Sequence, residues 1–170
     1  SPKINNKYIN FSTGSLGHGV SFGSGMAYSK KLKKKQGRIF VLASDGEMNS
    51  GSVWESAMLS SKLCLDNLVV VVDYNKFQAT GKSDEILNIK PLNKKWQSFG
   101  WDVIECNGNN HKSITLSLKN ILKNKKKPKI LISHTIKGKG VSFMENDNNW
   151  HYRSPSKKEL EQSKIQLGIK

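Results

Sequence analysis

The sequence has few cysteines and no long apolar run, and each shortage excludes a class of protein. Its two cysteines, Cys64 and Cys106, are far apart and lie in no metal-type spacing. Two isolated thiols are typical of a reducing compartment rather than of a disulfide scaffold, so we expect a cytoplasmic protein. No stretch approaches the roughly eighteen apolar residues of a membrane span, and no charged-then-apolar leader opens the chain. We therefore expect neither a membrane anchor nor a signal peptide.

The chain also lacks a methionine at its start and is lean in apolar residues. Hydrophobic residues make up 36% of the 170 positions, which is enough for one core of ordinary size. We therefore expect a single domain over residues 1–170. Because the chain opens at Ser1, we also expect it to be a fragment or a processed product that lacks an upstream segment.

Acidic residues are scarce overall, and the formal net charge of +15 suggests nucleic-acid binding at first sight. The lysines gather in runs at 30–35, 124–127 and 157–158, and no aromatic residues alternate with them as a stacking surface requires. Between residues 41 and 75 the balance reverses, because five acidic residues accompany one lysine, a net charge of −4. We interpret the lysine runs as solvated surface and expect no nucleic-acid partner.

Strand-like and helix-like segments alternate along the chain. Short apolar, β-branched runs predict buried strands, with the third of them the weakest, at 38–44, 67–73, 101–106 and 129–135. Periodicity and capping residues predict helices at 16–30, 52–63, 92–100, 111–124 and 154–168. The unbroken run "NLVVVVD" is typical of a parallel sheet covered on both faces. The pattern predicts an α/β fold with a doubly wound, mostly parallel sheet and helices on both faces.

Local signals refine this prediction. Four glycines recur between residues 16 and 30, and since glycine inside a helix costs about 1 kcal/mol relative to alanine, we expect another element or a ligand to approach closely there. The pairs Ser52–Glu55 and Ser156–Glu159 have capping-box spacing and predict two helix starts. The long polar loop at 138–153 is expected to line an active site.

Polar residues follow two of the predicted strands at the point where each one ends. Asp45 follows the first strand, in "SDGEMNSG" (44–51), and Asn75 follows the second, in "DYN". If the strands are neighbours, these side chains lie close together at the edge where α/β proteins bind ligands. A carboxylate and an amide oxygen suit Mg²⁺, which completes its shell with phosphate oxygens and water, and Gly46 lets the backbone approach a phosphate. Either motif alone is also an ordinary turn, but together they predict a metal–diphosphate site.

The same residues resemble a known family. "SDGE", followed about thirty residues later by "NK", resembles the thiamin-diphosphate motif, with Ser44 in place of its first glycine. "TGSLGHGVSFGSGMA" (13–27) resembles the glycine-rich turn and helix of transketolases, and "HTIKGKGVSFMENDNNWH" (134–151) resembles a later segment of their short, two-subunit type. The likeness covers about nine-tenths of the chain. The chain therefore resembles the N-terminal section of a transketolase, which binds thiamin diphosphate and Mg²⁺.

The resemblance implies roles for particular residues. Asp45 and Asn75 would bind Mg²⁺ through their side chains, and Phe77 through its backbone carbonyl. Gly46 would contact the diphosphate. The remaining positions match cofactor-lining residues of the family, namely Gly14, Leu16, Ala79 and His151. Two histidines, His18 and His151, are candidate catalytic residues, although each also fits an ordinary surface position.

One position departs from the family pattern. Ser50 stands where transketolases usually have a glutamate of an acidic network that links paired active sites. Glu55 occupies a second position of that network, and its alternative role is the predicted capping box. The serine at position 50 therefore puts communication between paired active sites in question. It removes none of the predicted metal ligands.

The resemblance also implies the activity and the partners. The expected reaction is transfer of a two-carbon ketol unit between sugar phosphates, with thiamin diphosphate as the cofactor. The family activates that cofactor through a glutamate of a pyrimidine-binding domain, so a C-terminal transketolase subunit should be the partner, and a dimer of such pairs is expected. The alternatives are another thiamin-diphosphate enzyme such as a deoxyxylulose-phosphate synthase, a non-catalytic fragment, and a basic nucleic-acid-binding domain.

Overall fold

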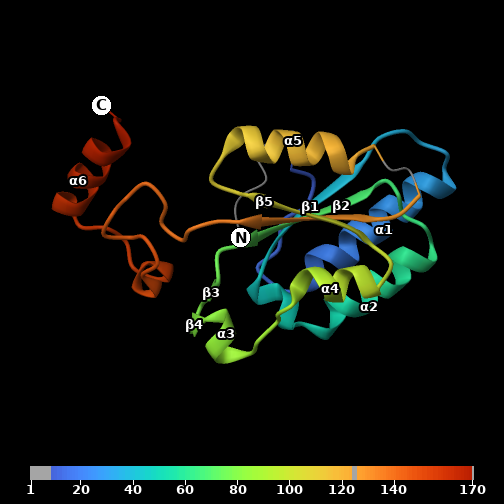
Figure 1. Ribbon diagram of the computed structural model, residues 1–170, viewed down its shortest axis with the longest axis horizontal. Helices are drawn as coiled ribbons and strands as arrows, with labels where there is room; N and C mark the ends of the chain where they lie inside the picture. The colour runs from blue at the N-terminus through green and yellow to red at the C-terminus, as the bar shows by residue number, and fades with distance from the viewer. Residues whose placement is uncertain (1–8, 124–125, 170) are drawn as a thin grey trace.

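A four-stranded parallel sheet forms the centre of the computed structural model, which describes residues 9–123 and 126–169 (Figure 1). Its strand order is β1-β2-β6-β5, and every neighbouring pair is parallel. The strands span Ile39–Ser44 (β1), Leu68–Tyr74 (β2), Asp102–Asn107 (β5) and Lys129–His134 (β6). All four strands were predicted from their apolar runs, each within one or two residues of its observed ends.

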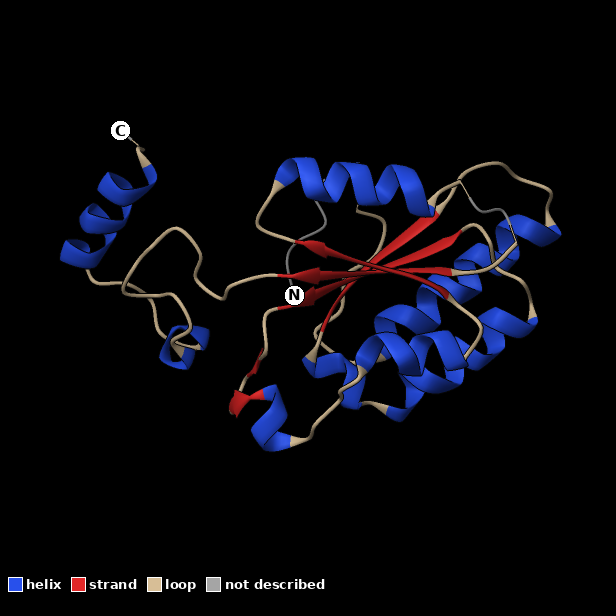
Figure 2. Cartoon of the chain, in the orientation of Figure 1, coloured by secondary structure: helices blue, strands red, loops and turns tan. Residues whose placement is uncertain are grey.

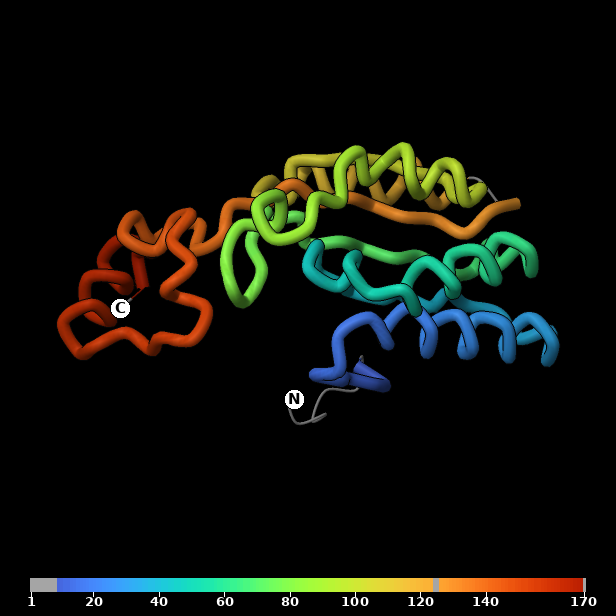
Figure 3. Tube along the Cα trace, turned by 90° about the horizontal axis from the view of Figure 1, so that it is seen from below, coloured from blue at the N-terminus to red at the C-terminus, as the bar shows by residue number. Residues whose placement is uncertain are grey.

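Helices cover both faces of the sheet, as predicted. Three of them lie on one face, and α5 lies across β5 and β6 on the other (Figures 1 and 3). These helices span His18–Leu32 (α1), Gly51–Lys62 (α2), Leu92–Ser98 (α4) and His111–Ile121 (α5). The predicted end of α5 at Asn124 lies outside the described residues. Because the two faces are covered by different crossovers, the fold is a doubly wound α/β sheet.

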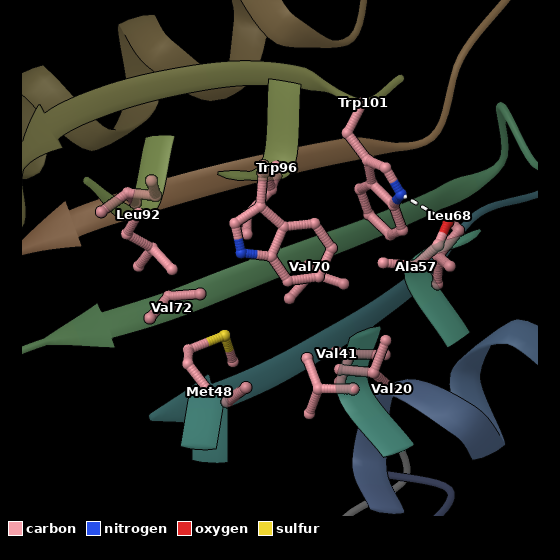
Figure 4. Packing of buried hydrophobic residues seen from close by; sticks show 14 of the residues in the cluster. Val20, Val41, Met48, Ala57, Leu68, Val70, Val72, Leu92, Trp96 and Trp101 are labelled. Carbon is pink, nitrogen blue, oxygen red and sulfur yellow. Dashed lines mark hydrogen bonds between the residues drawn. The ribbon is translucent and has the colours of Figure 1, made fainter. Parts of the chain in front are cut away.

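The main core lies between the sheet and the three helices of the first face (Figure 4). The valines of β2 explain why that strand lacks alternation, since Val69, Val70 and Val72 are all fully buried. Trp96 of α4 is also fully buried and contacts two further tryptophan rings. The outer edge of the opposite face is open, because Phe40 and Leu42 of β1 are 54% and 76% exposed.

The glycines of α1 allow a close approach to the sheet, as their frequency predicted. A Cβ atom on Gly23 would lie 2.2 Å from Cγ2 of Val41, which is closer than any real contact. Gly17, the residue that precedes the helix, has a left-handed φ of 83°, and a Cβ there would lie 2.4 Å from Cβ of Ser50. Gly25, in contrast, faces open space, so its presence is not explained by packing.

The predicted capping box at the start of α2 is wrong. The helix begins at Gly51, its N-cap is Ser50, and no side chain caps it. Ser52 lies inside the first turn and donates its hydroxyl to the Gly17 carbonyl at 2.9 Å, while Glu55 is exposed. The Ser52 hydroxyl is therefore used in a tertiary contact instead of a local one. The second predicted box is confirmed, since Ser156 and Glu159 cap α6 (Lys157–Leu167) reciprocally.

Several short elements were not predicted. They are the 3-10 turn η1 (Gly46–Asn49), the antiparallel pair β3 (Phe77–Gln78) and β4 (Gly81–Lys82), the turn α3 (Ser83–Ile86) and the 3-10 turn η2 (Asn148–His151). Figure 2 shows that β3, β4 and α3 project from the carboxyl end of β2. Elements of two to four residues carry too little periodicity to be recognised in a sequence.

The chain after β6 extends past the carboxyl ends of the strands. Figures 1 and 3 show residues 136–156 and α6 beyond that edge of the sheet. The loop packs on itself, because Trp150 donates its indole N–H to the Phe143 carbonyl at 3.0 Å and the two rings lie 5.3 Å apart. The predicted active-site loop, 138–153, therefore lies on the side of the sheet where the polar turns gather. No helix within residues 9–123 and 126–169 is long and apolar enough to cross a membrane.

Candidate functional site

Asp45 is buried where β1 ends. The parallel register places Ser44 beside Asp73, so the turns that follow β1 and β2 leave the sheet side by side. Asp45 is 0% exposed, and its Oδ2 accepts the Lys76 N–H at 2.7 Å and the Ser83 hydroxyl at 3.1 Å. Its Oδ1 is buried without a hydrogen-bond partner among the described residues. The two predicted strand ends thus meet, and one carboxylate oxygen remains available.

Burial dominates the electrostatics of Asp45. Desolvation raises the pKa of this carboxyl from 3.8 to about 6, against the hydrogen bonds from Lys76 and Ser83 and the nearby Gly46 N–H, which lower it. The neighbouring Asp73 carboxylate raises the pKa slightly further. Ionising a buried carboxylate without a counterion costs free energy. A cation at the unpartnered oxygen of Asp45 would lower this cost, because it replaces the solvation that is lost on burial.

Asn75 and Phe77 share the turn that contacts Asp45. The side-chain oxygen of Asn75 accepts the Phe77 N–H at 2.9 Å, and its amide group donates to Asp73 at 3.0 Å. Because an amide oxygen has two lone pairs, this contact leaves Asn75 with one further acceptor position. The residue between them, Lys76, has a left-handed φ of 72°, which is uncommon outside glycine and turns its N–H towards Asp45.

The donor set fits a hard cation. Within the described parts of the chain no group of three or more His, Cys, Asp or Glu residues could bind a metal ion. A zinc-type site is therefore not built from these residues, whereas Mg²⁺ needs only one or two protein carboxylates when phosphate oxygens and water complete its shell. The buried Asp45 oxygen and the Asn75 amide supply ligands of the type that Mg²⁺ prefers.

Gly46 and Ala79 lie beside this turn. Gly46 opens η1 and faces Gln78, because a Cβ there would lie 3.3 Å from Cγ of Gln78. Ala79 lies at the tip of the β3–β4 hairpin, and its carbonyl accepts the amide of Asn148 at 3.2 Å. The structure therefore brings the predicted positions 45, 46, 75, 77 and 79 to one end of the sheet.

The glycine-rich turn before α1 reaches the same edge through Glu47. One oxygen of Glu47 accepts the Gly17 N–H at 3.2 Å, and the other accepts the Ser44 N–H at 2.8 Å. Gly14 and Leu16 are exposed in this turn. His18 is exposed as well, with its Nδ1 atom 3.0 Å from the Ser15 hydroxyl and 3.3 Å from the Leu16 carbonyl. These polar contacts of His18 are thus with its own turn.

His151 lies in the loop beyond the edge, and the structure shows no contact between it and the Asp45 turn. It ends η2, is exposed, and its Nδ1 atom lies 3.2 Å from the Lys137 ammonium. The loop is tied to the β3–β4 hairpin by the bond between Asn148 and Ala79. A direct role for His151 stays a prediction.

Sequence reasoning missed four residues around Asp45. Ser83 and Lys76 bind its Oδ2 atom, Glu47 joins two turns, and Thr135 donates its hydroxyl to Asp73. Glu47 belonged to the quoted motif, but no role was predicted for it. Lys76 is the second residue of the quoted "NK", again with no role predicted. Ser83 and Thr135 gave no signal, because their contacts depend on how the turns after β2 and β6 fold back on the sheet. Ser50, the departure from the family pattern, packs against Gly17.

The parallel sheet and the acidic turn at its carboxyl edge are features of α/β proteins, which in general bind ligands beyond the strand ends. Comparison with known proteins specifies the family. Residues 2–170 match the family described as "Transketolase, thiamine diphosphate binding domain", and the chain belongs to this family. The resemblance inferred from the motifs is thereby confirmed.

Named relatives and solved structures agree with this assignment. The chain is 41% identical over 162 residues to a subunit of the apulose-4-phosphate transketolase of Phocaeicola vulgatus, covering 95% of this chain and 58% of that protein. It is 39% identical over 137 residues to a 6-deoxy-6-sulfo-D-fructose transketolase subunit of Clostridium sp., covering 81% and 50%. A transketolase crystal structure from Campylobacter jejuni superposes with a TM-score of 0.86 at 26% identity, covering 92% of this chain and 26% of that one. The match spans 58% and 50% of the lengths of these two subunit relatives.

Proposed function

We propose that this chain binds thiamin diphosphate through Mg²⁺ and forms the diphosphate half of a transketolase-type site. Asp45, Asn75 and the Phe77 carbonyl would hold the ion, and Gly46 would lie against the diphosphate. The observation that carries the proposal is the buried Oδ1 atom of Asp45, which has no partner among the described residues. An ion at this atom would supply the interaction that the protein leaves unmade.

The cofactor, when bound, would serve as the electron sink for transfer of a two-carbon ketol unit between sugar phosphates. The residues of this chain would anchor and orient it. Gly14, Leu16 and Ala79 would line it on either side of Gly46. Lys137 would stabilise negative charge near His151, since its ammonium lies 3.2 Å from that imidazole. His18 and His151 are proposed to approach the cofactor or substrate only in the assembled enzyme, because both are exposed here.

A partner chain is part of the proposal. Both relatives described above are named as subunits of a transketolase, which implies a second kind of chain in their enzymes. Phe40 and Leu42 of β1, together with Phe22 and Met26 of α1, are 37–76% exposed, which favours further protein packing over them. The partner would be the pyrimidine-binding subunit, and two such pairs would form the dimer.

The expected substrates and compartment follow the same reasoning. The relatives' names specify a sugar phosphate and a sulfo sugar, so an anionic sugar is the proposed substrate class. Cys64 and Cys106 are both free thiols, which supports a reducing, cytoplasmic environment.

The Asp45→Ala variant tests the proposal directly. Titration calorimetry of the assembled protein with thiamin diphosphate should show binding with Mg²⁺ and none with a chelator. In Asp45→Ala the Mg²⁺-dependent binding should be lost, because the ion loses its carboxylate ligand. Unchanged binding in this variant would refute the site. Asp66→Ala, which removes an acidic residue from a surface ion pair with Lys31, is the matched control.

Asp73 is predicted to act as a positioning residue. It accepts the Asn75 amide at 3.0 Å and the Thr135 hydroxyl, so it fixes the direction of the Asn75 oxygen. Thr135→Val should weaken Mg²⁺-dependent thiamin-diphosphate binding about tenfold, since outer partners of metal ligands contribute on this order. Thr135→Ser keeps the hydroxyl and should bind as the parent does. Equal binding by the valine and serine variants would contradict this role.

A further inference from the structure

Gln78 on β3 carries a buried hydrogen-bond donor that has no partner. Its side-chain nitrogen, Nε2, is buried and forms no hydrogen bond within the described residues. A buried amide nitrogen of this kind opposes folding, because it loses its hydrogen bonds to water and gains none in return. Such groups are rare in folded proteins, and each one calls for an explanation. A ligand that accepts a hydrogen bond at this position is one such explanation.

The neighbours of Gln78 place this nitrogen beside the proposed diphosphate position. A Cβ atom built on Gly46 would lie 3.3 Å from Cγ of Gln78 and 3.7 Å from its Cδ, which is the carbon that bears the amide nitrogen. Gly46 is the residue proposed to lie against the diphosphate. The amide of Gln78 and the backbone of Gly46 are therefore next to each other at the carboxyl edge of the sheet.

The backbone around Gln78 is anchored to the proposed metal ligand Asp45. Gln78 pairs with Gly81 in the antiparallel β3–β4 hairpin. The residues on either side of this hairpin bind the same carboxylate oxygen, since the Lys76 N–H and the Ser83 hydroxyl lie 2.7 Å and 3.1 Å from Oδ2 of Asp45. The Ser83 N–H also donates to the Lys76 carbonyl at 2.9 Å and closes the base of the hairpin. The position of Gln78 is thus tied to that of the Asp45 carboxylate.

Other buried atoms without a partner at this edge are acceptors. They are Oδ1 of Asp45, Oδ1 of Asn49 at the end of η1, and Oδ1 of Asn148, whose amide nitrogen donates to the Ala79 carbonyl. A carboxylate oxygen without a partner suits a cation, whereas the Nε2 atom of Gln78 suits an anionic oxygen. The unmade interactions of Asp45 and Gln78 therefore match the two parts of a metal–diphosphate pair.

We propose that Gln78 is a further cofactor-binding residue, whose side-chain N–H donates a hydrogen bond to an oxygen of the diphosphate. This inference rests on the proposed function, in which the diphosphate lies against Gly46 and an ion lies at Asp45. A neutral donor suits a position so close to the metal site. It stabilises an anionic oxygen, and it adds no positive charge that would repel Mg²⁺ from Asp45.

Gln78→Met tests the proposal, because methionine has a side chain of similar length but no N–H donor. Titration calorimetry of the assembled protein with thiamin diphosphate and saturating Mg²⁺ should show affinity about tenfold weaker, the equivalent of about 1.4 kcal/mol. Gln78→Glu should weaken binding further, since its negative charge faces the diphosphate. Gln97→Met, which changes an exposed glutamine of α4, is the matched control and should bind as the parent does.

Two further measurements separate a binding role from a structural one. Urea unfolding of the metal-free chain should show Gln78→Met to be at least as stable as the parent, because Nε2 has no hydrogen bond to lose. Inorganic pyrophosphate with Mg²⁺ should show the same tenfold loss as thiamin diphosphate, because it presents a diphosphate without the thiazolium ring. A destabilised variant, or a loss seen with thiamin diphosphate but not with pyrophosphate, would overturn the assignment of Gln78 to the diphosphate.

The outcome also distinguishes this inference from the proposed function. Parent protein that binds thiamin diphosphate only with Mg²⁺, together with an Asp45→Ala variant that does not bind, supports the proposed function. If Gln78→Met then binds as tightly as the parent, the metal site stands and the role of Gln78 is wrong. Parent protein that binds neither thiamin diphosphate nor pyrophosphate in the presence of Mg²⁺ would overturn both.

Discussion

Replacing Asp45 by asparagine is expected to stabilise the metal-free chain at neutral pH while removing its metal binding. The carboxyl is fully buried, and its pKa is raised from 3.8 to about 6. A difference of about 2 pKa units corresponds to roughly 3 kcal/mol by which ionisation of this group opposes folding above pH 6. Asparagine keeps an acceptor for Lys76 and Ser83 but carries no charge. We therefore expect Asp45→Asn to raise the free energy of unfolding by about 1–3 kcal/mol at pH 7.5.

The pH dependence gives this prediction a distinctive shape. Because the folded-state pKa of Asp45 lies above the unfolded value, the folded chain binds more protons between pH 3.8 and about 6. The contribution of this group to stability is thus complete below pH 3.8 and is lost as the pH rises through about 6. The asparagine variant should lack this loss. Mg²⁺ should offset the loss in the parent above pH 6, and its affinity should fall as protons compete below that pH.

Urea unfolding of parent and variant at pH 4 and pH 7.5, with Mg²⁺ or a chelator, measures both effects. The two proteins should differ little at pH 4 and most at pH 7.5 without metal. Asp66→Asn, which alters a surface ion pair, should show no such pattern. A destabilised Asp45→Asn at pH 7.5 without metal would show that the carboxylate is structural and would remove the physical basis of the proposed site.

Trp96→Ala is expected to have the largest effect on folding. The Trp96 side chain is fully buried in the core shown in Figure 4, with ring centroids 5.3 Å from Trp54 and 4.6 Å from Trp101. Its removal leaves a cavity between α4 and the sheet and should lower the free energy of unfolding by about 3–5 kcal/mol. The neighbouring Trp101 loses a ring contact but keeps its hydrogen bond to the Ala57 carbonyl at 2.9 Å.

Trp96→Phe is the matched control for this substitution. The indole N–H of Trp96 is buried without a partner among the described residues, so phenylalanine removes an unmade hydrogen bond together with part of the ring. We expect a loss of less than about 2 kcal/mol, measured by chemical unfolding of both variants. Equal losses for alanine and phenylalanine would mean that ring packing does not determine the stability of this core. Folded molecules of either variant should keep their metal response, because Asp45 lies at the strand ends and not beside Trp96.

The fold was largely predictable because its strands carry strong local signals. The run from Leu68 to Val72 is apolar without alternation, and this pattern belongs to a strand that is buried on both faces. The start of α2 was misjudged because Ser52 and Glu55 match a local pattern, whereas in the structure the Ser52 hydroxyl bonds to Gly17, which is 35 positions away. A tertiary contact of this kind leaves no trace in the spacing of neighbouring residues.

The candidate site, like the fold, contains residues that could be predicted from the sequence and others that could not. Asp45 and Asn75 could be paired from the sequence on the condition that their strands are neighbours, because neighbouring parallel strands end at the same edge of the sheet, and the structure meets this condition. Ser83 and Lys76 could not be assigned to Asp45, since their positions depend on the turns that follow β2. The cavity of about 740 Å³ that is lined in part by Lys76, Asn109 and Ile136 was likewise not predicted, because strand order is not encoded in the order of the segments.

The amino-acid sequence by itself determined the parallel α/β fold, the acidic turn and the transketolase family, since each rests on residue types at short or regular spacing. Only the tertiary structure decided which groups surround Asp45 and which of its oxygens has no partner among the described residues. The physical reason is that burial and hydrogen bonding are set by segments that are distant along the chain and meet only when the sheet is assembled.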